Sequence, residues 1–336
     1  MPWYRHLLWP FAVLYGSGVW IRNRLFDLGV LPAKQFDVPV ICVGNLEAGG
    51  TGKSPVVLSI LKQLSENGLN VAMLSRGYGR LTKGFREVSG SDSVTDVGDE
   101  PLQAKLRFPN LTIAVCEDRV EGVEQLLASE NRLDVIVMDD GFQHRWIKPS
   151  FSVLVTQSGF PFWKNHLLPV GTLREAKSEK GRADALVVVG NESNEADFSG
   201  ASFRAKIEVN SLVQVSGKAV DASEIDSVVL ISGIANSHRF EIIAKQNMSV
   251  LEHVKFGDHH NYTAVELKSL RKKLDSFGAA AQAVVTTEKD AARLKNSSLL
   301  NELGQTPVFY LPIDISFEGD EAKRFDQMIL EHGKHA

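Results

Sequence analysis

One short segment constrains what this 336-residue chain can fold into more than any other. The apolar run Val38–Val43 leads into the glycine-rich segment Gly44–Ser54, and a helical pattern continues over Pro55–Glu66. A strand, a glycine-rich turn and a helix, in this order, form the context that a phosphate-binding loop requires. We therefore expect such a loop here; the alternative is a glycine-rich turn at a helix start that binds no ligand.

The residues of this loop carry the chemistry that binding ATP needs. Glycines let backbone N–H groups close on phosphate oxygens, and the helix N-terminus adds the positive end of its dipole. Lys53 would reach the β- and γ-phosphates, and the Ser54 hydroxyl would bind Mg²⁺. The match is incomplete, because Glu47 replaces the first glycine of the usual GxxxxGK[ST] pattern. The expected ATP-binding residues are Gly49, Gly50, Thr51, Gly52, Lys53 and Ser54.

Apolar runs alternate with helical patterns on both sides of the loop. Runs of strand length lie at Val38–Val43, Val71–Leu74, Leu111–Val115, Val135–Met138, Val153–Val155 and Leu186–Val189. Helical patterns lie between several of them, at Pro55–Glu66, Glu100–Arg107 and Arg119–Glu130. This alternation predicts an α/β fold of the P-loop NTPase kind, with a parallel sheet covered on both faces.

A second series of elements begins near Phe203. Its strands are expected at Ile207–Val209, Val228–Ile231, Val250–Val254, Ala283–Thr286 and Val308–Leu311, with helices at Arg239–Gln246, Ala264–Phe277 and Glu288–Lys295. The polar stretch Asn191–Gly200 marks a boundary, and Phe317–Leu330 resembles a closing helix. We therefore expect a nucleotide-binding domain over residues 37–205 and a second, smaller α/β domain over residues 206–336.

The N-terminal segment differs from this α/β pattern. Leu7–Ile21 is a run of 15 residues without charge, interrupted by Pro10 and followed by Arg22 and Arg24. The run is too short to span a bilayer, which takes about 20 apolar residues, and no small-residue cleavage site follows it. Aromatic residues of the kind that settle among lipid headgroups are Trp3, Tyr4, Trp9, Tyr15 and Trp20. Residues 1–36 are thus expected to form an amphipathic, membrane-associating helix; a helix packed on its own domain is the alternative.

The composition excludes some functions. A formal net charge of −4 lacks the basic footprint of a nucleic-acid-binding protein, so no nucleic acid partner is expected. Cys42 and Cys116 are the only two cysteines, which are too few for a disulfide scaffold or a four-cysteine zinc site. Both lie in apolar stretches, and we expect buried thiols in a reducing compartment.

A pair of aspartates follows the run Val135–Met138. An apolar strand that ends in Asp is the expected second metal-binding element of such nucleotide-binding proteins. Asp139 and Asp140 would emerge at the carboxyl end of the sheet, next to the phosphate-binding loop. Solvated aspartates in a strand-end turn are the alternative, and the nearby loop favours a Mg²⁺ site.

Other polar residues follow predicted strands or open predicted helices at this edge. Alone, each is more often a helix cap, a salt bridge or a surface charge, but loops at this edge line ligand clefts. They are Asp99, Glu100, Arg119, Gln143, His144, Arg174, Glu175, His259 and His260. The segment Arg76–Arg80 is either an anion contact or a turn, and Thr286–Asp290 is best explained as a helix start capped by Thr287.

Taken together, these motifs resemble the tetraacyldisaccharide 4'-kinase family, the lipid A 4'-kinases, over nearly the whole chain. The resemblance rests on VGN…GGTGKSP (43–55), SRGYGR (75–80), GDEP (98–101), EDR (117–119), DDGFQH (139–144), P-x-G-x-LRE (169–175), SGIAN (232–236), F-x-DHH-x-Y (256–262) and TTEKDA (286–291). Ala176 and Ser237 stand where the family usually has proline, a departure that affects loop rigidity more than chemistry.

The resemblance implies a kinase that transfers the γ-phosphate of ATP to the 4'-hydroxyl of a tetraacylated glucosamine disaccharide 1-phosphate. It also implies a location on the cytoplasmic face of the inner membrane, as a peripheral or monotopic protein, and an active site between two α/β lobes. A regulatory P-loop NTPase that uses water as the nucleophile remains an alternative at this point, as does a membrane-bound nucleotide sensor without turnover.

Site roles follow from the same resemblance. Asp99 would be the base on the acceptor hydroxyl, supported by a histidine that we assign as His259, with His260 as the competitor. Lys53 and Arg119 would bind phosphate charge. The residues around the Mg²⁺ ion would be Ser54, Asp139, Asp140 and Glu175. Further cleft candidates are Glu100, Gln143, His144 and Arg174.

Overall fold

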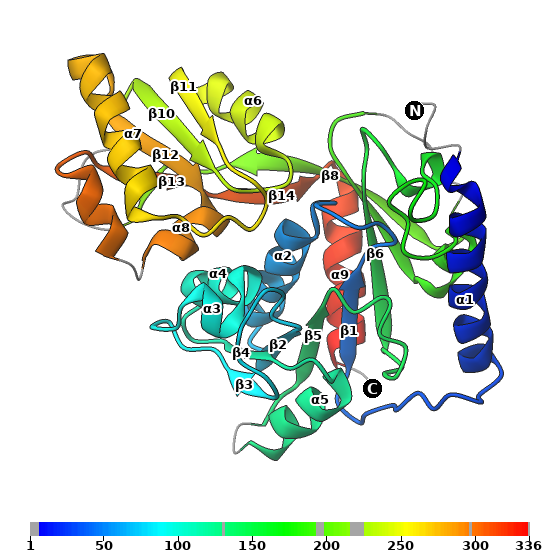
Figure 1. The fold of residues 1–336 in the computed structure, drawn as a ribbon. Coiled ribbons are helices and arrows are strands. Elements are labelled where there is room, and N and C mark those ends of the chain that lie inside the picture. Colours follow the sequence, from blue (N-terminus) through cyan, green and yellow to red (C-terminus); the bar gives the residue numbers. More distant parts are fainter. Residues whose placement is uncertain (1–6, 130–131, 193–197, 216–224, 296–297, 335–336) are drawn as a thin grey trace.

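The computed structural model describes residues 7–129, 132–192, 198–215, 225–295 and 298–334. Within these ranges the chain forms two sheets, a larger one of nine strands and a smaller one of five. Figure 1 shows the two sheets as neighbouring units, with the small sheet and its helices next to α4 and the large sheet. The expected α/β fold with a large, mostly parallel sheet and a second, smaller sheet is confirmed.

The large sheet has the strand order β14-β8-β7-β6-β1-β5-β2-β4-β3. All its neighbouring strands are parallel except the short β3 and the last strand β14. The strands are β1 (Val40–Gly44), β2 (Val71–Ser75), β3 (Arg86–Glu87), β4 (Thr112–Val115), β5 (Val135–Asp139), β6 (Phe151–Gln157), β7 (Ala185–Val189), β8 (Ala201–Val209) and β14 (Ile313–Phe317). Because β1 lies between β5 and β6, the glycine-rich loop leaves the middle of the sheet.

Helices cover both faces of this sheet. They are α2 (Lys53–Glu66), α3 (Val94–Val97), α4 (Asp99–Arg107), α5 (Arg119–Ala128) and α9 (Asp320–Lys334), with the 3-10 helices η2 (Phe162–Lys164) and η3 (Lys177–Arg182). Ile41 and Val43 of β1 pack in one core with α2, whereas Val40 and Cys42 pack in another core with α5. Successive strand residues point to opposite faces, so a strand buried on both faces reads as a continuous apolar run.

The small sheet has the order β11-β10-β12-β13-β9, with only β9 antiparallel to its neighbour. Its strands are β9 (Val213–Gln214), β10 (Ser227–Ser232), β11 (Ser249–Lys255), β12 (Ala283–Thr287) and β13 (Val308–Leu311). Its helices are α6 (Ser237–Asn247), α7 (Ala264–Phe277) and α8 (Glu288–Lys295), with the 3-10 helices η5 (Gly278–Ala280) and η6 (Ser298–Leu303).

The chain returns to the large sheet at its end, which the strand pattern did not predict. Strand β14 pairs antiparallel with β8, and α9 packs on the same core. The run Ile207–Val209, expected in the second series, therefore lies in β8 of the large sheet, and Phe317 ends a strand instead of opening the last helix. Burial of Phe203 against Phe317 and Phe325 accounts for the return. The domain limits at 37–205 and 206–336 stay a prediction. Because the chain returns to the large sheet at β14, its last residues would be counted with the first of these domains.

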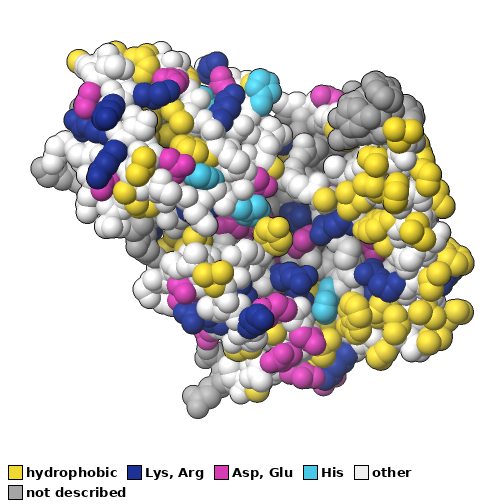
Figure 2. Space-filling model, in the orientation of Figure 1, with side chains coloured by type: hydrophobic (Ala, Val, Ile, Leu, Met, Phe, Trp, Pro, Cys, Tyr) yellow, Lys and Arg dark blue, Asp and Glu magenta, His cyan; other side chains and the backbone are white. Residues whose placement is uncertain are grey.

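Helix α1 (Trp9–Asp27) lies along one side of the large sheet, shown in dark blue in Figure 1. Its outer face is apolar: Phe11, Val13, Leu14, Trp20 and Ile21 each have more than half of their surface exposed, from 52% to 73%. Figure 2 shows hydrophobic side chains gathered over this helix. Among the described residues, no helix has the length and apolar character to cross a membrane. Trp3 and Tyr4 lie outside the described residues.

Candidate active site

The glycine-rich loop runs from the end of β1 to the start of α2, as the sequence predicts. Gly49 and Gly52 have φ angles of 104° and 86°, which favour glycine, so the loop needs these residues where they stand. Asn45 Nδ2 donates to the carbonyl of Glu47 (2.8 Å) and to Thr51 Oγ1 (2.9 Å), which ties the two ends of the loop together. The backbone is therefore shaped before a nucleotide arrives.

Glu47, at the position of the missing glycine, turns its side chain into the protein. Its carboxylate accepts hydrogen bonds from Thr156 Oγ1 (3.2 Å) and Asn165 Nδ2 (3.0 Å). Its φ is outside the left-handed region, so no glycine is needed there. Burial raises the pKa of Glu47, which these hydrogen bonds oppose. A buried, hydrogen-bonded Glu therefore stands where the usual pattern has glycine.

Lys53 and Arg174 bring two positive charges next to the loop. Lys53 Nζ lies 3.0 Å from Asn45 Oδ1 and 3.0 Å from Asp140 Oδ1. Arg174 donates to both oxygens of Asp140, at 3.1 and 2.9 Å. Burial would raise the pKa of Asp140, but Lys53 and Arg174 outweigh it and hold that pKa well below its usual range. Two positive charges therefore lie beside the glycine-rich loop.

Asp139 and Ser54 offer oxygens that suit a hard cation. Asp139 ends β5, is buried and accepts a hydrogen bond from Ser75 Oγ (3.2 Å). Burial, together with the negative charges of Glu100 and Asp140, raises the pKa of Asp139 to about 7. A cation beside Asp139 would relieve this cost, because an opposite charge favours the ionised form.

The donor set also fits Mg²⁺ in number. Within the described part of the chain, no three His, Cys, Asp or Glu side chains are arranged as a metal site of their own. Mg²⁺ commonly takes only one or two carboxylates and fills its shell with water and phosphate oxygens. Ser54 Oγ donates to Glu100 Oε1 (3.0 Å), so the hydroxyl expected to bind the metal has a carboxylate partner in this structure.

Glu175 has other partners than the expected metal site. Its side chain is 1% exposed, and Oε1 accepts hydrogen bonds from Arg22 (2.8 Å) and Asn23 (3.2 Å) of α1. Oε2 accepts hydrogen bonds from Gln143 (3.3 Å) and Arg182. Arg22 and Arg182 compensate the negative charge of the buried Glu175 carboxylate. None of the contacts described for Glu175 joins it to Ser54 or to the two aspartates, and its role at a metal remains a prediction.

Asp99 is the first residue of α4 and is 5% exposed. Its Oδ1 accepts a hydrogen bond from the N–H of Glu100 (2.9 Å), and its Oδ2 lies 3.0 Å from His259 Nδ1. Burial raises the pKa of Asp99, but the His259 hydrogen bond and the charges of Lys289 and Arg293 outweigh it and lower that pKa far below its usual range. The same hydrogen bond raises the pKa of His259.

The two histidines of the DHH motif face different partners. His259 has a φ of 56° and directs Nδ1 to Asp99. His260 stacks on Phe256, with ring centroids 4.5 Å apart, and its Nε2 lies 3.1 Å from Glu266, which belongs to the capping box of α7. The structure therefore pairs His259, and not His260, with Asp99.

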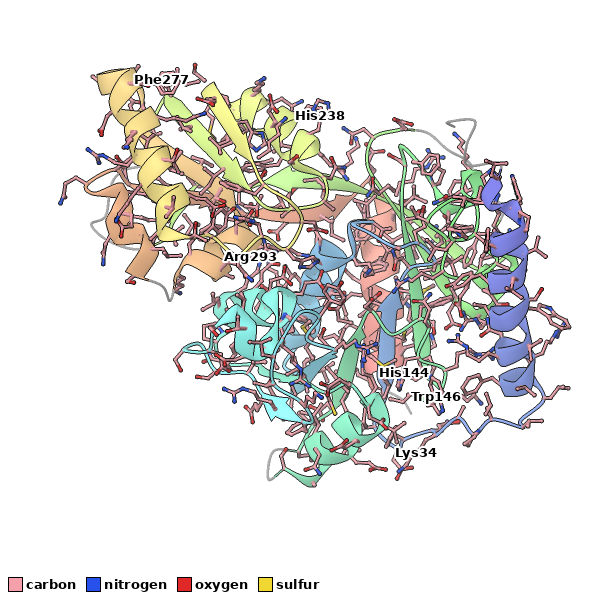
Figure 3. The ribbon with its side chains drawn as sticks, viewed as in Figure 1. Lys34, His144, Trp146, His238, Phe277 and Arg293 are labelled. Atoms are coloured by element: carbon pink, nitrogen blue, oxygen red, sulfur yellow. The ribbon has the colours of Figure 1, made fainter. Side chains whose placement is uncertain are left out.

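Three of the remaining candidates lie at the carboxyl end of the large sheet. Arg119 is buried at the start of α5 and donates to the carbonyl of Glu117 (3.0 Å). Burial, with the charge of Arg119 nearby, lowers the pKa of His144 to about 4, so this imidazole is neutral at pH 7. Figure 3 shows His144 beside Trp146. Gln143 Nε2 donates to the carbonyl of Asn45 (2.8 Å), which places it against the phosphate-binding loop.

Sequence reasoning missed two cations on α8. Thr287 Oγ1 accepts a hydrogen bond from the N–H of Asp290 (3.1 Å), as expected for the start of this helix. The same helix also carries Lys289, which lies 2.5 Å from Glu100 Oε1, and Arg293, which pairs with Asp99. Their i, i+4 spacing places both side chains on one face of the helix, and this pattern in the sequence could have identified them as a pair.

The segment Arg76–Arg80 combines a turn with a contact at the site. Arg80 pairs with Glu117 (2.7 Å) and donates to the carbonyl of Gly84, so this arginine holds a loop in place. Tyr78 is exposed, and its ring centroid lies 5.2 Å from that of His259. The segment therefore borders the Asp99–His259 pair.

Comparisons with known proteins all point to one family. A family model described as tetraacyldisaccharide-1-P 4'-kinase matches residues 4–334. The tetraacyldisaccharide 4'-kinase of Flavobacterium johnsoniae is 37% identical and that of Parabacteroides distasonis 36%; the matches cover 98% of this chain in both cases, and 97% and 95% of those proteins. The crystal structure of "apo" form LpxK from Aquifex aeolicus in complex with ATP is similar with a TM-score of 0.80 and 30% identity, over 98% of this chain and 99% of that one.

Proposed function

The chain belongs to the tetraacyldisaccharide 4'-kinase family, and from this premise we propose how its site transfers a phosphoryl group. As a member of the family it is an ATP-dependent lipid kinase that phosphorylates a tetraacyldisaccharide 1-phosphate in lipid A biosynthesis. The proposed active site lies where the phosphate-binding loop and α4 face α8 and His259. The observation that carries the proposal is the Asp99–His259 pair, in which Asp99 belongs to α4 beside the large sheet and His259 to the loop after β11 of the small sheet.

The phosphate-binding loop and its cations are proposed to bind ATP. Glycines 49, 50 and 52, Thr51 and the first turn of α2 would bind the phosphates through backbone N–H groups. Lys53 would move from Asp140 onto the β- and γ-phosphates, with Arg119 and Arg174 as further positive charges. The two contacts of Lys53 Nζ, both of 3.0 Å, support this, because they hold the ammonium beside the loop.

Ser54, Asp139 and Asp140 are proposed to hold a Mg²⁺ ion. When bound, the ion would neutralise charge on the β- and γ-phosphates. The raised pKa of Asp139 and the position of this residue at the end of β5 support the proposal. Glu175 belongs to this proposal only if it exchanges its partners on α1 for the ion.

Removal of divalent cations should therefore abolish the kinase activity. An excess of chelator should reduce lipid phosphorylation to background, and added Mg²⁺ should restore it. A matched measurement of the far-ultraviolet circular dichroism separates loss of the ion from loss of the fold. Full activity in excess chelator would contradict the metal proposal.

The Asp99–His259 pair is proposed to take the proton of the acceptor hydroxyl. The 4'-oxygen forms a bond to the γ-phosphorus, the bond between this phosphorus and the bridging oxygen breaks, and ADP leaves. The proton of the hydroxyl passes to the pair, which titrates as a unit. His259 is 40% exposed and Asp99 is buried, so the pair has one member open to solvent.

Helix α1 is proposed to bring the enzyme to its lipid substrate. Its exposed apolar side chains suit the acyl–headgroup boundary, and Arg24, with its exposed side chain, suits anionic lipid. From the family resemblance we propose that this contact is with the cytoplasmic face of the inner membrane.

The decisive test is transfer of label from γ-labelled ATP to the purified tetraacyldisaccharide 1-phosphate, followed by chromatography of the lipid. We expect label in the lipid, and little release of phosphate from ATP when the lipid is absent. Strong ATP hydrolysis without lipid would favour a regulatory NTPase, and nucleotide binding without any turnover would favour a nucleotide sensor.

A further inference from the structure

Helix α8 carries an arginine to the proposed base, and the roles described above do not use it. Arg293 Nη2 donates to Asp99 Oδ2, the same oxygen that His259 Nδ1 contacts. The arginine and the aspartate belong to different sheet units and are 194 residues apart in the chain. Figure 3 labels Arg293 where α8 meets α4.

We propose that Arg293 is a positioning residue for the transfer step, fixing the orientation in which the Asp99–His259 pair accepts the proton of the acceptor hydroxyl. This inference rests on the proposed role of Asp99. It adds to that role a residue whose guanidinium contacts Gly233, Asp290 and Asp99 and which acts on the reaction through Asp99.

Residues of the small-sheet unit, to which Arg293 belongs, hold its guanidinium in place. Its Nη1 donates to the carbonyl of Gly233 (2.7 Å) and to Asp290 Oδ1. Asp290 is fully buried and accepts further hydrogen bonds from the N–H of Gly233 (3.0 Å) and from Thr287 Oγ1 (2.7 Å). Three acceptors thus surround one planar fork, a geometry that arginine matches and lysine does not.

Burial strengthens the contact between Arg293 and Asp99 and keeps its geometry fixed. The side chains of Arg293 and Asp99 are 4% and 5% exposed, so water competes little for either. Asp99 has its other oxygen on the N–H of Glu100. With one oxygen fixed by the helix start and the other by Arg293, the carboxylate plane is set, and His259 meets it in one orientation.

Charged groups from three elements face Asp99. They are His259 from the loop after β11, Lys289 and Arg293 from α8, and Glu100 from α4 itself. Burial raises the pKa of Asp99, and the hydrogen bond from His259 with the charges of Lys289 and Arg293 lowers it further than burial raises it. Removal of the Arg293 charge should therefore raise this pKa, and the acid limb of the kcat–pH profile should move to higher pH.

The test compares Arg293→Met and Arg293→Lys in the full-length chain, with ATP and tetraacyldisaccharide 1-phosphate as substrates. For Arg293→Met we expect kcat to fall by about 10- to 100-fold, the usual scale for a misplaced reacting group, with KM for ATP unchanged and the acid limb shifted upwards. For Arg293→Lys we expect the acid limb to stay in place, because the charge remains, while kcat still falls, because the fork is lost.

Arg271→Met is the matched control. Arg271 is an arginine of the same sheet unit that donates to the carbonyl of Leu303 (2.7 Å) and to Thr306 (3.2 Å), away from Asp99. It should leave kcat and the pH profile unchanged. Melting curves of all variants show whether each is folded.

Two outcomes overturn the inference. One is a folded Arg293→Met enzyme with wild-type kcat and pH profile. The other, if Arg293→Met does not fold, is an Arg293→Lys enzyme with wild-type kcat. Asp99→Ala distinguishes these from failure of the proposed function. If Asp99→Ala abolishes transfer while the Arg293 variants do not, only the inference fails; if Asp99→Ala is fully active, the role of Asp99 fails.

Discussion

At the scale of single residues, the chemistry of the site depends on which partner each charged group has. Asp139 and Asp140 are neighbours in the chain, yet burial raises the pKa of Asp139 whereas Lys53 and Arg174 lower that of Asp140. Similarly, His259 and His260 are adjacent, and only His259 contacts Asp99. Neighbouring aspartates thus acquire different pKa values from their surroundings, and neighbouring histidines acquire different partners.

The pairing of Asp99 with His259 predicts non-additive mutants. Asp99→Ala should lower kcat by about 10²–10⁴, the usual range for loss of a general base, and leave ATP binding intact. Because the two groups act as a unit, His259→Ala added to Asp99→Ala should cost little more. Single-turnover rates of the two single mutants and the double mutant measure this. A fully multiplicative loss would show that the two side chains act independently.

His260→Ala serves as the control for this pair. His260 contacts Glu266 at the start of α7 and stacks on Phe256, so its loss should change stability more than kcat. A kcat loss in His260→Ala as large as that in His259→Ala would contradict the assignment of the dyad.

At the scale of elements, helix α1 is joined to the site as well as exposed to the outside. Arg22 and Asn23 bind Glu175, and Tyr15 donates to the carbonyl of Arg174 (2.9 Å), whose side chain holds Asp140. A deletion of residues 1–24 would therefore remove partners of the buried Glu175 together with the apolar face. Substitutions on the outer face separate the two roles.

We predict that Phe11→Gln, Leu14→Gln and Ile21→Gln together weaken membrane binding without loss of fold. Each side chain is more than half exposed, so its removal costs little packing, but the apolar area that enters the lipid boundary is lost. Flotation with vesicles that contain anionic lipid measures the binding. Val265→Gln, an exposed apolar residue of α7, is the control. Equal flotation of the triple variant and the wild type would mean that another surface binds the membrane.

At the scale of the whole molecule, the two sheets are joined on one side of the site through α4. Gln103 and Arg107 of α4 contact Glu288 at the start of α8, at 2.8 and 3.3 Å. Arg107 also donates to the carbonyl of Ile313 (3.2 Å) and pairs with Asp314 of β14. One arginine thus connects a helix of the large sheet, a helix of the small sheet and the strand by which the chain returns.

Arg107→Met should therefore destabilise the protein more than the loss of a surface pair. We expect about 1–3 kcal/mol, below the range for fully buried pairs because these side chains retain some exposure. Thermal unfolding measures it as a melting temperature lowered by several degrees. Lys206→Met, which breaks the exposed pair with Glu318, is the control and should lower the melting temperature little, because water screens this pair. Equal melting temperatures for the two variants would remove Arg107 as a connection.

Much of the fold was predictable from local patterns. Runs such as Val135–Met138 are apolar at every position because both faces of a central parallel strand are buried. This pattern can be recognised in the sequence without knowing which elements cover the strand. The phosphate-binding loop was also predictable from a local pattern, because the backbone path of the loop requires glycine at Gly49 and Gly52.

The sequence by itself therefore determined the α/β class, the loop, the family and the edge of the sheet at which polar residues gather. Only the tertiary structure decided which of these residues meet: His259 with Asp99, Glu175 with Arg22 and Asn23, and Arg293 with Asp99 across the two sheets. It also decided that β14 and α9 return to the large sheet. Such contacts join residues more than 100 positions apart, and packing of whole elements, not local propensity, selects them.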